Sequence, residues 1–224
     1  MTPHLFRLAA ALCLLLATGT ARAEASVADL AFRVLLDETP IGRHAFRVTD
    51  AEDGERTVDI AADFDVRILF VPVYRYRHRN TERWEDGCLV SLRSETDDNG
   101  QDFTVRTRST DDGLRVEGGA SVEGCASSFA YWDRTFLGAE RLLNSQDGSV
   151  VDVEVDALGA DAFEVDDVSI AAERFRLTAD EGLDISLWYT PDGRWVGLET
   201  VRDGRVVRYE PERAEALALA GEGP

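Results

Sequence analysis

The chain has 224 residues and a formal net charge of −19, with 24 Lys and Arg against 43 Asp and Glu, and 44% of its residues are hydrophobic. These values suit one globular domain with a full core, and they exclude a disordered chain or a multidomain assembly. So acidic a surface is repelled by phosphate backbones and by anionic lipid headgroups, which excludes a nucleic-acid binder.

The N-terminal segment has the features of a secretory signal peptide in their usual order. Arg7 precedes an apolar run over residues 8–17 that is too short to span a bilayer, and Ala21-Arg22-Ala23 follows as a cleavage site. We therefore expect cleavage after Ala23 and a periplasmic or secreted protein. No later apolar run is long enough for a membrane helix, and Leu12 stands where a lipidated Cys13 would need a small residue.

Turns that place glycine after an acidic residue or asparagine punctuate the rest of the chain. These dipeptides supply the positive φ of tight hairpins, and their spacing predicts strands of about eight residues. They are Asp53-Gly54, Asp86-Gly87, Asn99-Gly100, Asp112-Gly113, Asp147-Gly148, Glu181-Gly182, Asp192-Gly193 and Asp203-Gly204. The pattern predicts an antiparallel meander.

The segment 58–70 is the first long strand of this meander. Apolar residues from Val58 to Phe70 alternate with polar ones from Asp59 to Arg67, so one face is dry and the other charged.

The next strand, 74–84, is unusual on both faces. One face carries Tyr74, Tyr76, His78, Asn80, Glu82 and Trp84, and the other carries Arg75, Arg77, Arg79, Thr81 and Arg83. Aromatic walls with a few hydrogen-bonding groups are typical of a ligand pocket. Alternatively, the aromatic face lies at a solvated barrel rim, and the arginines pair with the aspartates of the preceding strand.

Cleavage after Ala23 leaves two cysteines, Cys88 and Cys125. In an oxidising compartment these predict one disulfide. A redox or metal pair is less well supported, because the C-x-x-C spacing and a neighbouring histidine are both absent from the sequence.

One internal stretch, 133–144, has a helical pattern in which Asp133 can act as the N-cap, although Gly138 weakens it. Just before it, Tyr131 and Trp132 are candidates for the wall or lid of a cavity, or for anchors that pin the helix across an open barrel end. A closing meander over 183–210 and a flexible tail over 212–224 complete the chain. The tail has an Ala-rich helical propensity over 212–220, but we expect it to fray.

These elements predict an all-β fold. We expect residues 24–211 to form a single, strongly curved or closed antiparallel barrel of about 10–12 strands with one short helix. Curling around the apolar face turns that face into a core or a cavity.

Several aromatic motifs resemble an uncharacterised family of exported proteobacterial proteins known only as a domain of unknown function. They are Tyr74-Arg75-Tyr76-Arg77-His78, Glu82-Arg83-Trp84-Glu85-Asp86-Gly87, Tyr131-Trp132-Asp133, Leu142-Leu143-Asn144, Leu187-Trp188-Tyr189 and Asp192-Gly193-Arg194-Trp195-Val196. The family has no assigned activity, so the resemblance implies no catalytic residue. The closing meander is also similar, in architecture, to lipocalin-like periplasmic barrels and lipoprotein carriers.

The leading functional hypothesis is a binding or carrier module for an apolar or amphipathic small molecule, without enzymatic activity. Its candidate ligand-binding residues are Tyr74, Tyr76, His78, Glu82, Trp84, Tyr131 and Trp132. The alternatives are a structural or assembly protein of the cell envelope, and a hydrolase-like or isomerase-like enzyme that uses His78 and Glu82.

No metal or cofactor is expected. His44 shares a face with Phe46 and could point inward, but no spacing forces it to meet His78 and Glu82 in a metal site. The sequence also contains no zinc-protease, Walker or nucleophile-elbow motif.

Overall fold

The computed structural model describes residues 26–51 and 54–221, so the expected signal peptide, residues 1–23, lies outside the described part of the chain. The bounds of the elements are β1 (Ser26–Leu36), β2 (Thr39–Asp50), β3 (Arg56–Ile68), β4 (Val71–Glu85), β5 (Cys88–Asp98), β6 (Gln101–Thr110), β7 (Gly113–Val116), β8 (Ser121–Glu123), the 3₁₀ turn η1 (Arg134–Gly138), β9 (Arg141–Leu143), β10 (Val150–Val165), β11 (Val168–Ala179), the 3₁₀ turn η2 (Asp180–Gly182), β12 (Leu183–Tyr189), β13 (Trp195–Arg202), β14 (Arg205–Pro211) and α1 (Ala214–Gly221).

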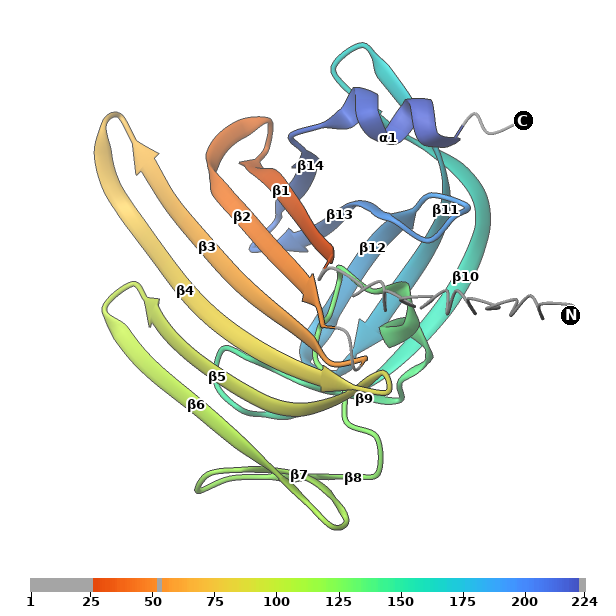
Figure 1. The fold of residues 1–224 in the computed structure, drawn as a ribbon. Coiled ribbons are helices and arrows are strands. Elements are labelled where there is room, and N and C mark those ends of the chain that lie inside the picture. The colour runs from red at the N-terminus through yellow and green to blue at the C-terminus, as the bar shows by residue number, and fades with distance from the viewer. Residues whose placement is uncertain (1–25, 52–53, 222–224) are drawn as a thin grey trace, which may run out of the picture.

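The strands form one antiparallel sheet of 14 strands in the order β8-β7-β6-β5-β4-β3-β2-β1-β14-β13-β12-β11-β10-β9. The sheet has two meandering arms, β1–β8 and β9–β14. They are joined by pairing of β1 with β14, which runs from Phe32 to Leu36 on β1. The sheet curls into a nearly closed barrel (Figure 1), which confirms the predicted all-β fold. The strands outnumber the expectation because several, such as β7, β8 and β9, are only three or four residues long.

The two arms meet at a seam between β5 and β9. There the N–H of Leu89 on β5 donates to the carbonyl of Ala126 at 2.8 Å, and the N–H of Leu143 on β9 donates to the carbonyl of Ser127 at 2.8 Å. Ser128 and Leu143 also form a parallel bridge. Backbone hydrogen bonding thus continues from one arm to the other, and β6–β8 form an extension beyond the seam (Figure 1).

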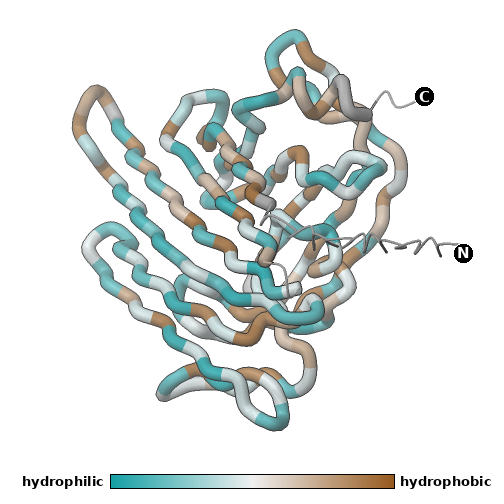
Figure 2. Tube along the Cα trace, in the orientation of Figure 1, coloured by the Kyte–Doolittle hydropathy of each residue, from teal (hydrophilic) through white to brown (hydrophobic). Residues whose placement is uncertain are grey.

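Alternation divides the strand residues between an apolar interior and a polar exterior, and Figure 2 shows the alternating colours along β3 and β4. The interior core takes side chains from nearly every strand. Its closest aromatic contact joins Phe32 on β1 and Trp195 on β13, with ring centroids 3.9 Å apart. This core fills the part of the barrel near Trp84 and Trp132, where both indoles are buried.

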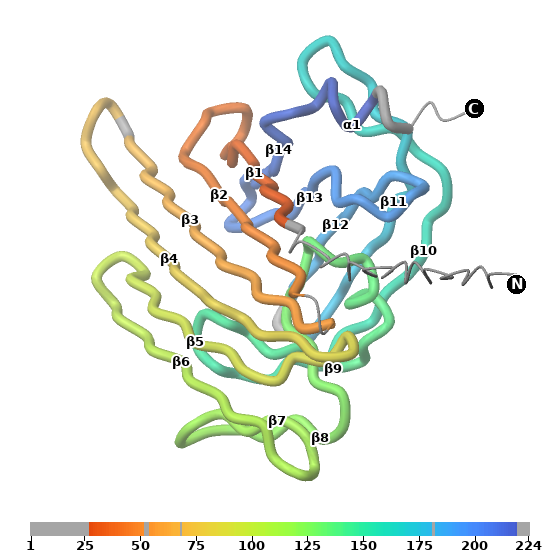
Figure 3. The backbone as a smooth tube through the Cα atoms, in the orientation of Figure 1, coloured from red at the N-terminus to blue at the C-terminus, as the bar shows by residue number. Residues whose placement is uncertain are grey.

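A second, smaller core lies on the outer face of β12 and β13. The β10–β11 hairpin reaches the level of α1 (Figure 3), and Phe163 from this hairpin packs against Trp188 at 5.0 Å. Ala214 and Leu217 of α1 belong to the same cluster. The segment 212–224, expected to be a flexible tail, therefore contains a helix that packs on the barrel. Among the described residues, no helix is both long and apolar enough to cross a membrane.

The helix expected over residues 133–144 is much shorter in the structure. Asp133 caps it as predicted, by accepting a hydrogen bond from the N–H of Thr135 at 2.9 Å, but the 3₁₀ turn ends at Gly138. The following residues form β9 and pair with β10. This pairing uses the backbone groups that a longer helix would need, because each N–H and C=O takes part in one ladder.

The acidic-glycine turns behave as predicted at three hairpins. Asp86-Gly87, Asn99-Gly100 and Asp203-Gly204 each have positive φ at both residues. This is the conformation that two-residue hairpins of type I′ require, and glycine adopts it without steric cost.

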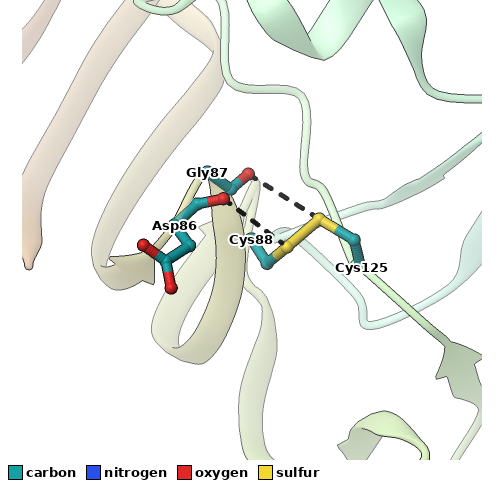
Figure 4. The surroundings of a disulfide bond; sticks show 4 residues. All are labelled: Asp86, Gly87, Cys88 and Cys125. Atoms are coloured by element: carbon teal, nitrogen blue, oxygen red, sulfur yellow. Dashed lines mark hydrogen bonds between the residues drawn. A yellow bond between two sulfur atoms is a disulfide. The ribbon is translucent and has the colours of Figure 1, made fainter.

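The predicted disulfide joins Cys88 and Cys125, which are 37 residues apart in the sequence. The two sulfur atoms lie 3.9 Å from the carbonyl oxygens of Asp86 and Gly87 (Figure 4). Cys125 directly precedes the seam residue Ala126, and Cys88 precedes Leu89. The bond therefore fastens the seam at the start of β5.

Replacing both cysteines by serine should lower the free energy of unfolding by roughly 4 kcal/mol, because the disulfide restricts a loop of this length in the unfolded chain. Urea unfolding of the variant and the oxidised wild type measures the difference. The single variant Cys88→Ser should lose as much as the double variant, and equal stability of all three would contradict the expectation.

Candidate functional site

The inner face of β4 carries the row of aromatic and polar side chains expected from the sequence. His78, Asn80, Glu82 and Trp84 are buried, and Tyr74 and Tyr76 are half-buried on the same face. The intervening side chains are exposed or half-buried.

The arginine row on the outer face of β4 pairs with carboxylates of β3. Arg77 contacts Asp63 at 3.2 Å and Asp65 at 2.6 Å, and Arg79 contacts Asp63 at 2.9 Å. The cross-strand pairing proposed from the sequence is confirmed. Pairs this exposed add little to stability, so the row serves mainly to keep the outer face solvated.

Glu82 is the most enclosed polar residue of the row, with 1% of its surface exposed. Its Oε1 accepts hydrogen bonds from Asn80 Nδ2 and Ser128 Oγ, both at 2.9 Å, and its Oε2 accepts from Trp84 Nε1 at 3.0 Å. Burial raises the pKa of the carboxyl, while these donors and the nearby indole of Trp132 pull the pKa down. Because Ser128 belongs to the seam, Glu82 holds the closing segment from inside.

His78 has a separate set of partners. Its Nδ1 lies 2.9 Å from Thr96 Oγ1, and its Nε2 lies 3.4 Å from Ser145 Oγ. The Thr96 hydroxyl donates to the carbonyl of Gln146 at 3.3 Å, so it accepts from Nδ1–H and leaves Nε2 as an acceptor for Ser145. Burial, with the neighbouring charge of Arg79, lowers the pKa of His78 to about 4, so the imidazole is neutral at pH 7.

This arrangement does not favour the enzyme hypothesis. A histidine base in a hydrolytic triad has a carboxylate at Nδ1 that stabilises the imidazolium, whereas His78 has the hydroxyl of Thr96 there. Glu82 has its own three donors and no hydrogen bond to His78 within the described residues. The described residues also contain no group of three or more His, Cys, Asp or Glu side chains that could hold a metal ion.

The far end of β4 carries a third network at the barrel mouth. Tyr74 donates to Asp98 Oδ1 at 2.7 Å, and Tyr76 donates to Gln146 Oε1 at 3.3 Å. Gln146 Nε2 in turn donates to Asp98 Oδ2 at 3.2 Å. The loop after β9 is thus tied to β4 and β5 by side chains.

Several half-buried aromatic rings gather around this mouth. We define the aromatic cluster as His44, Phe64, Tyr76, Tyr131 and Tyr209, which come from β2, β3, β4, the segment before η1, and β14. Phe64 stacks on Tyr76 with centroids 5.3 Å apart, and His44 lies 5.7 Å from Tyr209. These side chains face the interior, although each residue as a whole keeps partial exposure.

His44 is the unusual member of the aromatic cluster. Both ring nitrogens are buried, and neither has a hydrogen-bond partner among the described residues. Burial, with the nearby His78, lowers the pKa of His44 to about 3, so the ring is neutral at pH 7. A neutral imidazole has one donor and one acceptor, and leaving both unpaired inside a protein is costly.

The structure separates the seven sequence-predicted ligand residues into two groups. Glu82, Trp84 and Trp132 lie together in the filled part of the core, where the two indoles pack edge to face at 5.4 Å. Tyr74, Tyr76 and His78 lie toward the mouth. Tyr131 faces that end too, and it stacks on Trp195 at 5.3 Å.

Sequence reasoning missed Tyr209, Phe64 and Gln146 as neighbours of this row. Phe64 is on the dry face of the predicted strand 58–70, so its inward direction was evident, but its contacts were not. Gln146 lies in a turn whose position across the barrel depends on the seam.

A hollow of about 790 Å³ lies beside the N-terminal half of β1, just beyond the end of β14. It is framed there by Ala31, Trp195 and Leu217 and continues along β2–β5 past Phe46 and Asn80. None of the seven predicted residues lines this hollow.

Replacing Glu82 by Leu should lower the free energy of unfolding by about 3–5 kcal/mol, because three buried donors lose their acceptor. Urea unfolding measures the loss, and amide hydrogen exchange at Leu89 and Leu143 should become faster as the seam loosens. As a matched control, Glu85→Leu changes an exposed carboxylate on the same strand and should shift stability far less. Equal effects of the two variants would contradict the role of Glu82.

The fold and the interior row define a β-barrel-like protein. A solved structure with a similar fold is the beta-barrel-like protein of a domain of unknown function, DUF1849, from Brucella abortus, with a TM-score of 0.60, 11% identity, and coverage of 82% of this chain and 94% of that one. The chain itself belongs to the family DUF6134, a domain of unknown function, which matches residues 32–212. No curated protein matches it.

Proposed function

We propose that this domain binds an apolar or amphipathic small molecule at the aromatic cluster in the mouth of its barrel. The proposal rests on His44, because neither of its two buried ring nitrogens has a hydrogen-bond partner among the described residues. Folding leaves such groups unpaired only at a cost, so an occupant that pairs with them adds binding free energy.

The surroundings of His44 indicate the chemistry of the ligand. The rings of Phe46, Phe64 and Tyr209 lie within 6.4 Å of the imidazole and offer apolar contact. The neutral imidazole offers one donor and one acceptor. A hydrocarbon body carrying a hydroxyl or a similar neutral polar group fits both features.

His44→Phe should separate this function from stability. At pH 7 the variant should be more stable by about 1–3 kcal/mol, since two unpaired buried nitrogens are removed. Native mass spectrometry of protein purified from its own source should show a bound mass on the wild type that is lost in the variant. Phe163→Leu alters an aromatic ring on the outer face and should retain the bound mass. Equal bound mass on His44→Phe, or bare wild-type protein in repeated preparations, would refute the proposal.

The stability of the wild type should also depend on pH through His44. Its pKa is lowered from 6.5 to about 3, so His44 is neutral in both states above pH 6.5, and the wild type loses stability as the pH falls from 6.5 toward 3 because the unfolded chain takes up the proton first. Glu82, with a raised pKa, acts in the opposite direction in part of this range. The difference between wild type and His44→Phe isolates the histidine, and it should change by up to ~1.4 kcal/mol per pH unit below pH 6. Urea unfolding between pH 7 and 4.5 measures it, and a constant difference would contradict the burial of a neutral His44.

We further propose that the domain acts in the periplasm or outside the cell, after removal of residues 1–23. The order of charge, apolar run and Ala-x-Ala site supports this location, as does a disulfide in the mature part. N-terminal sequencing of the exported protein should begin at Glu24. Recovery of the chain in the cytoplasm with Met1 retained would contradict it.

A further inference from the structure

The β3–β4 hairpin ends in an apolar tip, which we define as residues Leu69, Phe70, Val71 and Val73. Leu69 is 87% exposed and Phe70 is 93% exposed, and Val71 and Val73 are exposed at 60% and 45%. Hydrophobic colours gather at this hairpin end at the upper left of Figure 2. Single exposed apolar residues are common on proteins, but four together at one tip are not.

The backbone of the tip adds an independent observation. Leu69 and Phe70 have φ values of 48° and 73°, in the left-handed region. Bulky apolar side chains are disfavoured there. Three equivalent turns of this chain use Asp-Gly or Asn-Gly, and the β1–β2 turn, which also has two positive φ values, uses the polar pair Asp37-Glu38. The tip therefore exposes two large hydrophobic side chains on a backbone conformation that is unfavourable for them.

The apolar tip also projects beyond the rest of the barrel. In the described chain, pairing of β3 with β2 ends at Phe64, and pairing of β4 with β5 ends at Tyr76. Beyond these points the two strands pair with each other, and the contacts to the β5–β6 turn are made by Tyr74 and Arg75 at the base. The hairpin end projects at the upper left of Figure 1. Four residues beyond Phe64 correspond to roughly 13 Å of extended strand, so the tip is clear of its neighbours.

Counted along the sequence, the charge of the hairpin end is opposite to that of the whole chain, while Asp63 and Asp98 lie at its base, where they contact Arg77 and Tyr74. Residues 65–77 contain one carboxylate, Asp65, against the three arginines Arg67, Arg75 and Arg77. Arg67 has no ion pair with any other described residue, while Asp65 pairs with the other two. The full chain has a net charge of −19, but charges more than a Debye length of about 8–10 Å away are largely screened at physiological salt.

We infer that the apolar tip inserts into the surface of a phospholipid bilayer, with Arg67 placed at the headgroups. The tip offers only hydrocarbon and aromatic side chains, which enter the boundary between headgroups and acyl chains without specific hydrogen bonds. An arginine beside such a tip can extend its guanidinium to the lipid phosphates. This inference does not rest on the proposed ligand site, because it uses different residues.

The test replaces Leu69 and Phe70 by the Asn-Gly pair that the β5–β6 turn uses. In the variant L69N/F70G, the turn becomes Asn-Gly, so the fold should be as stable as the wild type or more stable. Vesicles of phosphatidylethanolamine and phosphatidylglycerol at 3:1, in 150 mM salt, should carry the wild type in a flotation assay. The variant should partition at least tenfold more weakly.

Three controls keep the interpretation specific. Leu158→Asn removes an exposed apolar residue far from the tip and should float as the wild type does. Arg67→Ser should weaken binding to these vesicles more than binding to phosphatidylcholine vesicles. His44→Phe should still float, so failure of the ligand proposal leaves this one unaffected.

Either of two kinds of result would overturn the inference. The first is a wild type that stays with the unbound fraction, or a folded L69N/F70G variant that floats equally well. The second is a wild-type dimer in light scattering that the variant abolishes while neither protein binds vesicles, since the tip would then contact a second copy of the chain.

Discussion

The seam between β5 and β9 is the constraint on which the rest of the barrel depends. Every other strand contact is a hairpin or the β1–β14 pair, and either would survive in an open sheet. The seam rests on a few backbone hydrogen bonds at Ala126–Ser128, supported from inside by the Glu82 carboxyl and from the edge by the disulfide. The placement of Ser145 and Gln146 against β4 and β5 follows from it. Without closure the aromatic cluster would have no opposite wall.

The barrel interior changes character along β4. Near the seam, Trp84 and Trp132 fill the space, and Glu82 is saturated with donors, so this part is a structural core. Toward the mouth, the residues are half-buried and the ring nitrogens of His44 have no partner among the described residues, and this is the part for which we propose a ligand. The β3–β4 hairpin links the mouth to the apolar tip, because Phe64 and Tyr76 stand on the same two strands. The two proposals, binding of an apolar molecule at the mouth and contact of the tip with a bilayer, are therefore compatible with each other.

The sequence predicted most of the meander because strand alternation and turn chemistry are local signals. The two faces of β4, the arginine pairing and the disulfide were evident from residue types and spacing. Long-range contacts were not: Ser128 and Gln146 come from irregular segments, and nothing nearby in the chain indicates that they meet β4. The helix over 133–144 was overestimated since β9 has a pairing partner that a local pattern does not show. The Leu69-Phe70 turn lacks the glycine that marked the Asp-Gly and Asn-Gly turns, so its conformation also went unanticipated.

The disulfide makes the closure of the barrel depend on the redox state of two cysteines. Cys88 and Cys125 bracket the excursion from β5 to β8 and end next to the seam, so their oxidation links two edges that are otherwise joined by a handful of amide contacts. Reduction would leave the two edges joined only by those hydrogen bonds and by the Glu82 carboxyl. In a thiol-rich compartment closure of the barrel would therefore rest on weak contacts alone, and an oxidant would make it covalent.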